Sequence, residues 1–397
     1  MTSAKRWLLP DGVEEILPVE AHKLETLRRG LLDLYESWGY ELVIPPMIEF
    51  LDSLLVDSSH DQDIHTFKIT DQLSGKMMGI RADITPQVAR IDAHSMNRQG
   101  PVRLCYADSV LHTKPRGIMT SRVPIRAGAE LFGYAGVDCD IELISLMRDT
   151  LKVAGIDDIY VVLGHVGIFR TLVKEASLSS KIERELFQAV QHKAFDEIDR
   201  ILFANVDDKK LCDMLRRLTL LSGDESVLTE AQELFIAAPE SVRQELDKLV
   251  EISTAVKLRN PGIQLNYDLC ELLGYEYHTG IVFAAYTPGY GRAVAKGGRY
   301  DDIGEAFGRA RPASGFDTDL KVLAKLTGIN IQRKPGILAP SGSDQFLLKK
   351  IAELRESGEI VIVDLNKSST SDDRHELGCD RKLALINEHW QIQALEQ

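Results

Sequence analysis

The chain has 397 residues, of which 44% are hydrophobic and 27% are charged, and its formal net charge at pH 7 is −13. This length suits about two to three globular domains, and the acidic balance argues against a general nucleic-acid-binding surface, which is basic. The first apolar run is broken by Pro10 and Gly12, so we expect no signal peptide. No apolar run approaches the roughly 18 residues of a membrane span.

The cysteines are scattered, odd in number and contain no CxxC pair. They are Cys105, Cys139, Cys212, Cys270 and Cys379. This pattern favours reduced thiols in a cytoplasmic protein. The His, Cys and carboxylate residues show no zinc-site spacing, so we expect neither a metal nor another cofactor.

The first part of the chain alternates helices and strands. Leu24, Leu27 and Leu31 recur at helical spacing within Glu20–Trp38, and Gly39 is suited to end that helix. The remaining elements expected before residue 166 are a strand at Glu41–Ile44, a hairpin at His65–Ile80, a helix at Thr85–His94, strands at Val102–Tyr106 and Ala129–Tyr134, a helix at Asp140–Val153 and a strand at Ile159–Leu163.

A block of helical periodicity follows, from about residue 166 to 258. The helices expected there are Lys181–Phe203, Lys209–Leu221, Leu228–Ala238 and Ser241–Leu258. Strands are expected again at Ile263–Tyr267, Tyr277–Tyr286 and Arg292–Val294, and a last core helix at Asp319–Leu326. Beyond a Pro- and Gly-rich linker we expect a helix at Phe346–Glu356, a strand at Ile360–Asp364 and a tail. Strand runs interrupted by one helical block indicate an α+β fold with an antiparallel sheet.

Two acidic segments contain candidate site residues. Asp83 and Thr85 stand two residues apart just before a helix, where the simplest role for either is an N-cap. Glu130 alternates with apolar residues on a strand, and it faces either solvent or a pocket.

Aromatic residues and glycines mark two further segments. Tyr277 and His278 begin a run that reads YHTGIVF, and Tyr300 lies in GGRYD. Without further information, the first run is an aromatic-rich strand with a glycine for close backbone approach. The second could equally be a hairpin bend with a surface ion pair.

Together these segments resemble histidyl-tRNA synthetases, which are class II aminoacyl-tRNA synthetases. The resemblance extends over about Trp7–Leu326, and five consecutive matches in Gly297–Asp301 carry it most strongly. It implies a synthetase-like core over residues 1–326, with the helical insertion at about 166–258, and a short C-terminal α/β domain over 327–397. It also implies that Glu20–Pro46 corresponds to the first class II motif, which forms a homodimer interface in that family.

The resemblance assigns histidine-binding roles by position. Asp83 and Thr85 stand where that family holds the α-ammonium, and Glu130 would accept from the imidazole or the ammonium. Tyr300 would form one wall of the imidazole pocket, beside Tyr277 and His278 of the other motif. Arg126 replaces a glutamine of the family. It is our candidate for the ligand carboxylate, and the alternative is an ion pair with Glu130 along the strand.

Three positions lack an arginine that the synthetases carry, and a fourth has reversed charge. An arginine of the family is replaced by His112, Leu273 and Val322 in turn, and Lys114 replaces a glutamate. Adenylation needs cations where phosphate charge develops, and each such donor commonly contributes about 3–4 kcal/mol. We therefore expect a chain that binds histidine without activating it.

This combination resembles the family of ATP phosphoribosyltransferase regulatory subunits. The segments WLLPDGVEEILP, RADITPQ and GAELFG carry the resemblance. It implies no catalysis by the chain itself, activation of a short-form catalytic subunit in the first step of histidine biosynthesis, and transmission of histidine inhibition. The implied partners are that subunit, a second copy of the chain and histidine, but not tRNA. The alternative is an active histidyl-tRNA synthetase or a related paralogue that activates an amino acid.

Overall fold

A computed structural model describes residues 7–55, 60–117, 120–271, 277–365 and 377–395. It divides the chain into two compact units, Met1–Ile329 and Asn330–Gln397. Among the described residues, no helix is long and apolar enough to cross a membrane. Leu273, which replaces a family arginine, lies outside the described residues.

The first unit is built on a nine-stranded sheet in the order β1-β5-β6-β12-β11-β10-β7-β9-β8. The strands are β1 (Glu41–Leu42), β5 (Val102–Ser109), β6 (Ile125–Phe132), β7 (Tyr160–His165), β8 (Ser222–Gly223), β9 (Gln264–Asp268), β10 (Ile281–Tyr286), β11 (Ala295–Arg299) and β12 (Ala313–Asp319). The expected α+β class is confirmed. The sheet is mainly antiparallel, but β1 pairs with β5 and β7 with β9 in parallel.

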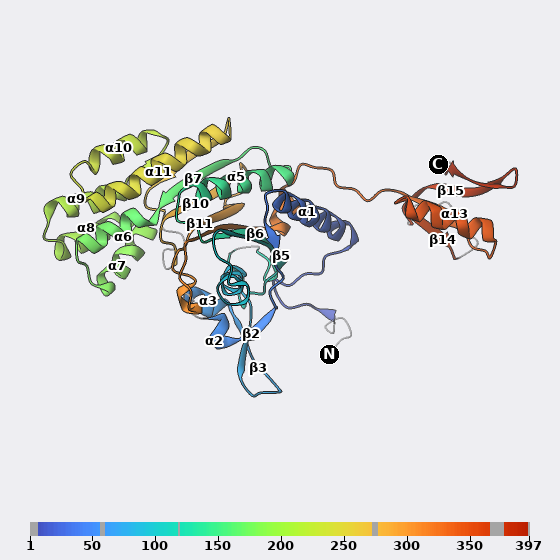
Figure 1. The fold of residues 1–397 in the computed structure, drawn as a ribbon, viewed down its shortest axis with the longest axis horizontal. Coiled ribbons are helices and arrows are strands. Elements are labelled where there is room, and N and C mark those ends of the chain that lie inside the picture. Colours follow the sequence, from blue (N-terminus) through green and yellow to red (C-terminus); the bar gives the residue numbers. More distant parts are fainter. Residues whose placement is uncertain (1–6, 56–59, 118–119, 272–276, 366–376, 396–397) are drawn as a thin grey trace. The chain divides into compact units, whose positions relative to one another are not determined.

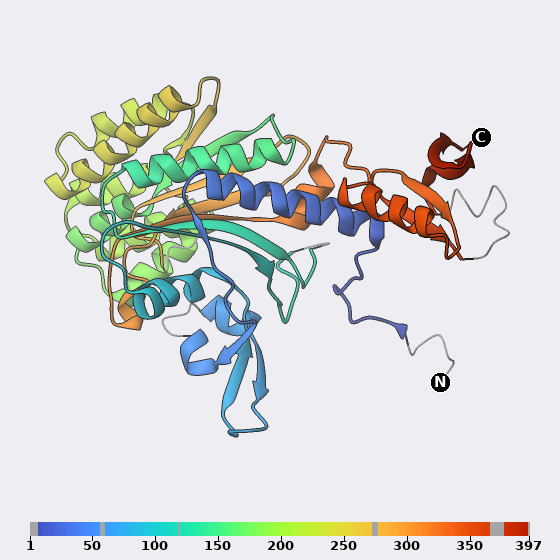
Figure 2. The ribbon, with the colours of Figure 1, turned by 45° about the vertical axis from the view of Figure 1, so that its right-hand side comes forward.

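Helices α1 (Pro18–Ser37) and α5 (Asp138–Val153) lie side by side over one face of the sheet (Figures 1 and 2). In α1, Leu24, Leu27, Leu31 and Tyr35 are buried at three- and four-residue steps, as the sequence periodicity predicted. The helix ends before Gly39, whose φ of 83° is the left-handed conformation that glycine adopts without strain. The ring of Tyr35 meets that of Phe316 on β12 edge-on at 6.2 Å.

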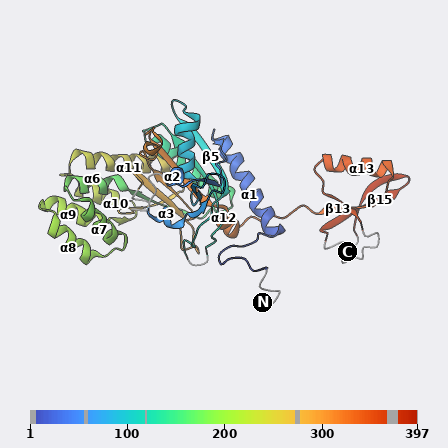
Figure 3. The same cartoon turned by 90° about the horizontal axis from the view of Figure 1, so that it is seen from below.

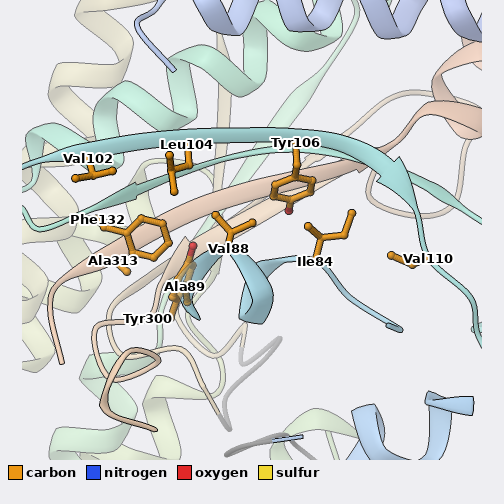
Figure 4. Close-up of a cluster of buried hydrophobic side chains, with 10 residues drawn as sticks. All are labelled: Ile84, Val88, Ala89, Val102, Leu104, Tyr106, Val110, Phe132, Tyr300 and Ala313. Carbon is orange, nitrogen blue, oxygen red and sulfur yellow. The ribbon is translucent and has the colours of Figure 1, made fainter. Parts of the chain in front are cut away.

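The opposite face of the sheet packs against α4 (Thr85–Arg90). Figure 4 shows Ile84 and Val88 beneath Leu104 and Tyr106 of β5. Burying aliphatic side chains of this size stabilises a fold by about 1.5–3 kcal/mol each. The expected helix at Thr85–His94 is interrupted, because a π-helix, η2 (Ile91–Met96), follows Arg90.

A separate three-stranded sheet has the order β2-β4-β3, with β2 at Ile48–Phe50, β3 at Phe67–Thr70 and β4 at Met77–Ile80. The antiparallel pairing of β3 with β4 confirms the predicted hairpin. The short helices α2 (Leu51–Leu54) and α3 (His60–His65) lie between β2 and β3 in the chain. The expected strand Glu41–Ile44 is shorter than predicted, since pairing with β5 is limited to Glu41 and Leu42.

The insertion between β7 and β9 contains α6 (Val166–Glu175), α7 (Ser180–Gln191), α8 (Phe195–Asn205), α9 (Lys209–Leu218), α10 (Ser226–Leu234) and α11 (Glu240–Arg259), as Figure 3 shows. The single helix expected at Lys181–Phe203 is wrong. The chain turns between α7 and α8, where Lys193 takes a φ of 50°. The block is also not entirely helical, because β8 pairs with β9 at the sheet edge.

The second unit is a four-stranded sheet in the order β14-β13-β15-β16, covered by α13 (Gln345–Glu356). Its strands are β13 (Gly336–Pro340), β14 (Val361–Asp364), β15 (Cys379–Ile386) and β16 (His389–Ala394). Two predictions are corrected here. Part of the expected linker is β13, the centre of a small core around Ile337 and Leu347, and the expected tail forms the β15–β16 hairpin.

Three corrections concern the middle of the large sheet. The strand expected at Arg292–Val294 is instead β11, which begins at Ala295, and the strand expected from Tyr277 begins at Ile281. Strand β12 was not anticipated, although it is the partner of both β6 and β11. It leads into α12 (Leu320–Leu326), which Asp319 caps by accepting from the Lys321 amide at 3.0 Å. A short 3₁₀ turn, η3 (Glu305–Phe307), precedes β12.

Candidate functional site

Glu130 of β6 is the centre of a buried polar cluster on the α4 face of the sheet. Thr85 Oγ1 donates a hydrogen bond to Glu130 Oε1 at 2.8 Å, and the Tyr106 hydroxyl donates to the same oxygen at 3.2 Å. The Tyr300 hydroxyl donates to Oε2. Figure 4 shows Tyr106 and Tyr300 on the side of the sheet that α4 covers. The structure therefore brings Thr85, Glu130 and Tyr300 together from three distant segments.

Glycines make room for this cluster on the neighbouring strands. Glu130 lies opposite Gly315 of β12, which lies opposite Gly298 of β11. A Cβ atom at Gly315 would overlap the Glu130 carboxylate and would lie 2.6 Å from the Tyr300 hydroxyl oxygen. A side chain at Gly315 therefore cannot coexist with Glu130 in this position.

Burial sets the charge state of Glu130. The side chain is 1% exposed, and this desolvation raises the carboxyl pKa to about 8. The hydroxyls of Tyr300 and Thr85 act in the opposite direction, while Asp83 and Asp317 add to the rise. The ring of donors suits a carboxylate, yet the surroundings contain too little positive charge to keep it ionised at pH 7. A cationic ligand would supply that charge.

Asp83 has one structural role and one free oxygen. Its Oδ1 accepts from the Ile84 amide at 2.7 Å and from the Thr85 amide at 3.4 Å, so it supports the start of α4. The N-cap expected at Asp83 or Thr85 is wrong, because Ile84 occupies that position and Thr85 is already the first helical residue. Among the described residues, the other carboxylate oxygen has no hydrogen-bond partner. Asp83 can therefore support the helix and still offer one oxygen to a ligand.

Arg126 pairs with Asp317 of β12, with Nη1 3.4 Å from Oδ2. The expected alternative, an ion pair with Glu130 along the strand, is wrong, because the sheet register brings a carboxylate of another strand closer. Burial tends to lower the pKa of Arg126, but Asp317, Asp319 and Asp83 outweigh it and raise the pKa above its ordinary value.

Tyr277, His278 and Tyr300 form an aromatic group. The ring centroids of Tyr277 and His278 are 4.3 Å apart, and that of Tyr300 lies 6.2 Å from His278. His278 is buried, and desolvation lowers its pKa to about 4, so the ring is neutral at pH 7. Its Nδ1 therefore donates to the Arg299 carbonyl oxygen, at 3.1 Å. A neutral, fixed histidine is suited to packing against a ligand ring.

Arg299 anchors the Tyr300 segment from the other face of the sheet. Its Nη2 lies 2.6 Å from Oδ2 of Asp140, a carboxylate of α5 that is almost completely buried. Its Nη1 lies 3.3 Å from Asp301 Oδ1. Removing one partner of a buried pair commonly costs about 3–5 kcal/mol, so this pair holds the GGRYD segment against α5.

Two of the positions that lack a family arginine, His112 and Val322, are described, and neither offers a cation to a phosphate. The ring of His112 is 2% exposed, and its Nε2 donates to the Ala82 carbonyl oxygen at 3.0 Å. Desolvation lowers the His112 pKa to about 4, so the ring carries no charge at pH 7. Val322 is a half-buried aliphatic residue of α12, and Lys114 is exposed. Among the described residues, no group of His, Cys, Asp and Glu side chains is arranged to hold a metal.

The sequence analysis missed three residues of this cluster: Tyr106, Lys296 and Asp317. Lys296 of β11 lies directly opposite Asp317, which lies opposite Gly128 of β6. The signal that could have found Lys296 is the two-residue alternation that places it on the same face as Gly298.

Two different family models match this chain, one in each of its two compact units. Residues 12–323 match the family model described as histidyl-tRNA synthetase, and residues 334–393 match the model of the ATP phosphoribosyltransferase subunit HisZ C-terminal domain. A crystal structure from Bacillus halodurans, titled as an ATP phosphoribosyltransferase regulatory subunit/histidyl-tRNA synthetase, aligns with a TM-score of 0.83. It is 24% identical and covers 96% of this chain and 99% of its own. This likeness shows the fold.

A histidyl-tRNA synthetase from Nostoc sp. PCC 7120 shares the fold as well, with a TM-score of 0.78, 18% identity, and coverage of 96% of this chain and 91% of its own. Two curated relatives are named ATP phosphoribosyltransferase regulatory subunit. That of Ectopseudomonas mendocina is 52% identical over 100% of both chains, and that of Thioalkalivibrio sulfidiphilus is 52% identical over 99% of both. The resemblance inferred from the motifs is confirmed, and the chain belongs to the family of ATP phosphoribosyltransferase regulatory subunits.

Proposed function

We propose that this chain binds free histidine at the Glu130 cluster and passes that signal to the catalytic subunit of an ATP phosphoribosyltransferase. As a regulatory subunit, it would activate a short-form catalytic subunit in the first step of histidine biosynthesis and inhibit it when histidine is bound. The observation that carries the proposal is the buried Glu130 carboxyl, to which three hydroxyl groups donate.

The cluster has the charges that a zwitterionic amino acid requires. Glu130 and the free oxygen of Asp83 are acceptors for an ammonium or an imidazole N–H, and charge-assisted bonds of this kind are strong. The Arg126 guanidinium provides positive charge near the ligand carboxylate, although the same guanidinium also pairs with Asp317. The rings of Tyr277, His278 and Tyr300 supply an aromatic wall for an imidazole.

We infer that the chain does not activate the histidine that it binds. His112 is buried, uncharged and bonded to a backbone carbonyl, and Val322 has no donor at all. Neither can stabilise the charge that develops on a phosphate during adenylation. The C-terminal segment from Ile331 contains nine Lys and Arg against eleven Asp and Glu, so it lacks the basic excess of a tRNA-binding domain.

The proposed assembly contains a second copy of the chain. Strand β1 lies at an edge of the large sheet, and large apolar side chains at and after it are exposed. They are Leu42, Ile44, Met47, Ile48 and Phe50. An exposed apolar edge strand promotes aggregation unless another chain covers it. These residues overlap and extend the segment that corresponds to the first class II motif, so we assign this edge to a homodimer within a larger complex.

Calorimetry with the purified chain and free histidine tests the ligand. We expect saturable binding with one site per chain, whereas a chain that binds no histidine at millimolar concentration would contradict the proposal. Mixing the chain with a short-form catalytic subunit tests regulation. The rate should rise on adding the chain and fall again on adding histidine.

Histidine-dependent exchange of pyrophosphate into ATP separates this proposal from an amino-acid-activating enzyme. We expect exchange at the level of a blank without protein, because the phosphate-binding arginines are missing. Exchange well above that level would favour the synthetase or its paralogue.

A further inference from the structure

Lys296 is a half-buried cation on the face of the sheet that carries Glu130. It belongs to β11, two residues before Gly298 and four before Tyr300. The strand register places it opposite Asp317, and Asp317 lies opposite Gly128. Residues that lie opposite one another on β6, β12 and β11 form a row across the sheet. Lys296 belongs to the row with Asp317 and Gly128, which is next to the row of Glu130, Gly315 and Gly298.

Within the described part of the chain, Lys296 has no ion pair within 4 Å and no hydrogen bond to its ammonium. Its strand neighbour Asp317 pairs instead with Arg126 at 3.4 Å. Burial and the nearby charges of Arg126 and Arg116 lower the pKa of Lys296, and the charges of Asp317 and Asp83 only partly offset them. A cation that is half-buried and unpaired is in an unfavourable state, which a bound anion would relieve.

The Glu130 row presents a carboxyl group that accepts hydrogen bonds. The Lys296 row contains an ammonium group, unpaired among the described residues, beside the Asp317 carboxylate, which Arg126 already neutralises. Rows two residues apart along a strand are separated by roughly 7 Å. That separation is comparable to the length of an extended amino acid such as histidine, whose cationic and anionic groups must meet opposite charges at different places.

We propose that the Lys296 ammonium binds the carboxylate of the amino-acid ligand, and that it is the residue that distinguishes an α-amino acid from the corresponding amine. This inference rests on the proposed histidine site. Lys296 is better placed for direct contact than Arg126, because Asp317 already shares the Arg126 guanidinium. A single lysine gives a point contact rather than the two-point fork of an arginine.

Histamine is the matched probe, since it keeps the imidazole and the ammonium of histidine and lacks only the carboxylate. Calorimetry should show that the wild-type chain prefers histidine over histamine by roughly ten- to hundredfold, the range for a hydrogen bond between charged groups. In Lys296→Met the affinity for histidine should fall by that factor and the affinity for histamine should stay the same. Lys296→Arg should retain part of the preference. The exposed Lys325→Met is the control and should behave as wild type.

Three outcomes would overturn the assignment. The first is a Lys296→Met variant that keeps the wild-type preference for histidine over histamine. The second is a wild-type chain that binds both ligands equally. The third is that both Lys296→Met and Lys296→Gln lose affinity for histidine and for histamine. That result would mean that Lys296 maintains the shape of the site and does not bind the carboxylate. A wild-type chain that binds neither ligand would instead contradict the proposed function itself.

Discussion

The Tyr300 hydroxyl donates a hydrogen bond to the Glu130 carboxylate across 170 positions of sequence. Three paired strands make this contact, because β12 lies between β6, which carries Glu130, and β11, which leads into Tyr300. Gly315 on β12 is the residue over which the two side chains meet. The candidate site therefore depends on the pairing of β6, β12 and β11 as much as on the residues themselves.

Removing the charge of Asp83 should weaken histidine binding. Asp83→Asn is preferable to alanine, because the asparagine oxygen can still accept from the amides of Ile84 and Thr85 and so keeps the start of α4. We expect the loss of about 1.5–3 kcal/mol that accompanies loss of a bond to a charged group. Calorimetry on the two proteins measures it, and equal affinities would remove Asp83 from the site.

Glu130→Gln should abolish tight histidine binding and stabilise the unliganded chain at high pH. The folded-state pKa of about 8 is above the ordinary value of 4.5, so the carboxyl has no net effect on stability below pH 4.5. The cost of ionising the buried carboxyl grows as the pH rises from 4.5 to 8 and is complete above pH 8, where it is of the order of 5 kcal/mol.

Urea unfolding at pH 5 and pH 8.5 tests this linkage. The stability of the wild type relative to Glu130→Gln should fall between the two pH values, while the exposed Glu36→Gln variant should show no comparable change. A difference between wild type and Glu130→Gln that is independent of pH would contradict the burial of an ionisable group at this position.

Histidine binding should release a proton from Glu130. At pH 7 the carboxyl of the unliganded chain is mostly protonated, because its pKa is about 8, and a bound ammonium favours the carboxylate. Calorimetry in buffers with different ionisation enthalpies should reveal a release approaching one proton per ligand at pH 7 and less at pH 8.5. A release that does not change with pH would point to another group.

Arg126→Gln should weaken histidine binding by about 1 kcal/mol, roughly fivefold, since it removes positive charge near the ligand carboxylate and leaves Asp317 unpaired. Feedback inhibition should weaken in parallel, whereas activation of the catalytic subunit should persist, because activation requires only the interface between the subunits. Rates of the assembled complex over a range of histidine concentrations measure both. Unchanged histidine sensitivity would mean that Arg126 serves the fold alone.

Ile44→Lys should dissociate the homodimer. Ile44 is 74% exposed beside the edge strand β1, and burying a lysine in an apolar interface is costly. Light scattering of the wild type should give about twice the chain mass of 44.3 kDa, and the variant should approach the single mass. Ile236→Lys, which replaces an isoleucine that is 77% exposed on the helical insertion, should remain dimeric. A monomeric wild type would contradict the assignment of this edge.

Local sequence determined much of this fold. The leucine spacing and Gly39 gave α1 its buried face and its end, because helical periodicity and a left-handed glycine act within a few residues. The motifs also identified Asp83, Thr85, Glu130 and Tyr300 as site candidates, and the structure places the last three in hydrogen-bond contact. The predictions of secondary structure failed mainly at strands, such as β12, which was not predicted, and β13, which was predicted to be part of the linker.

Only the tertiary structure decided which charges meet. The pairing of Arg126 with Asp317 rather than Glu130, and the position of Lys296 without a partner among the described residues, follow from the register of β6, β12 and β11. Register is set by strands far apart in the chain, and a shift of one residue would turn every side chain to the other face. Burial, which raises the pKa of Glu130, likewise results from the packing of whole elements and has no local signature in the sequence.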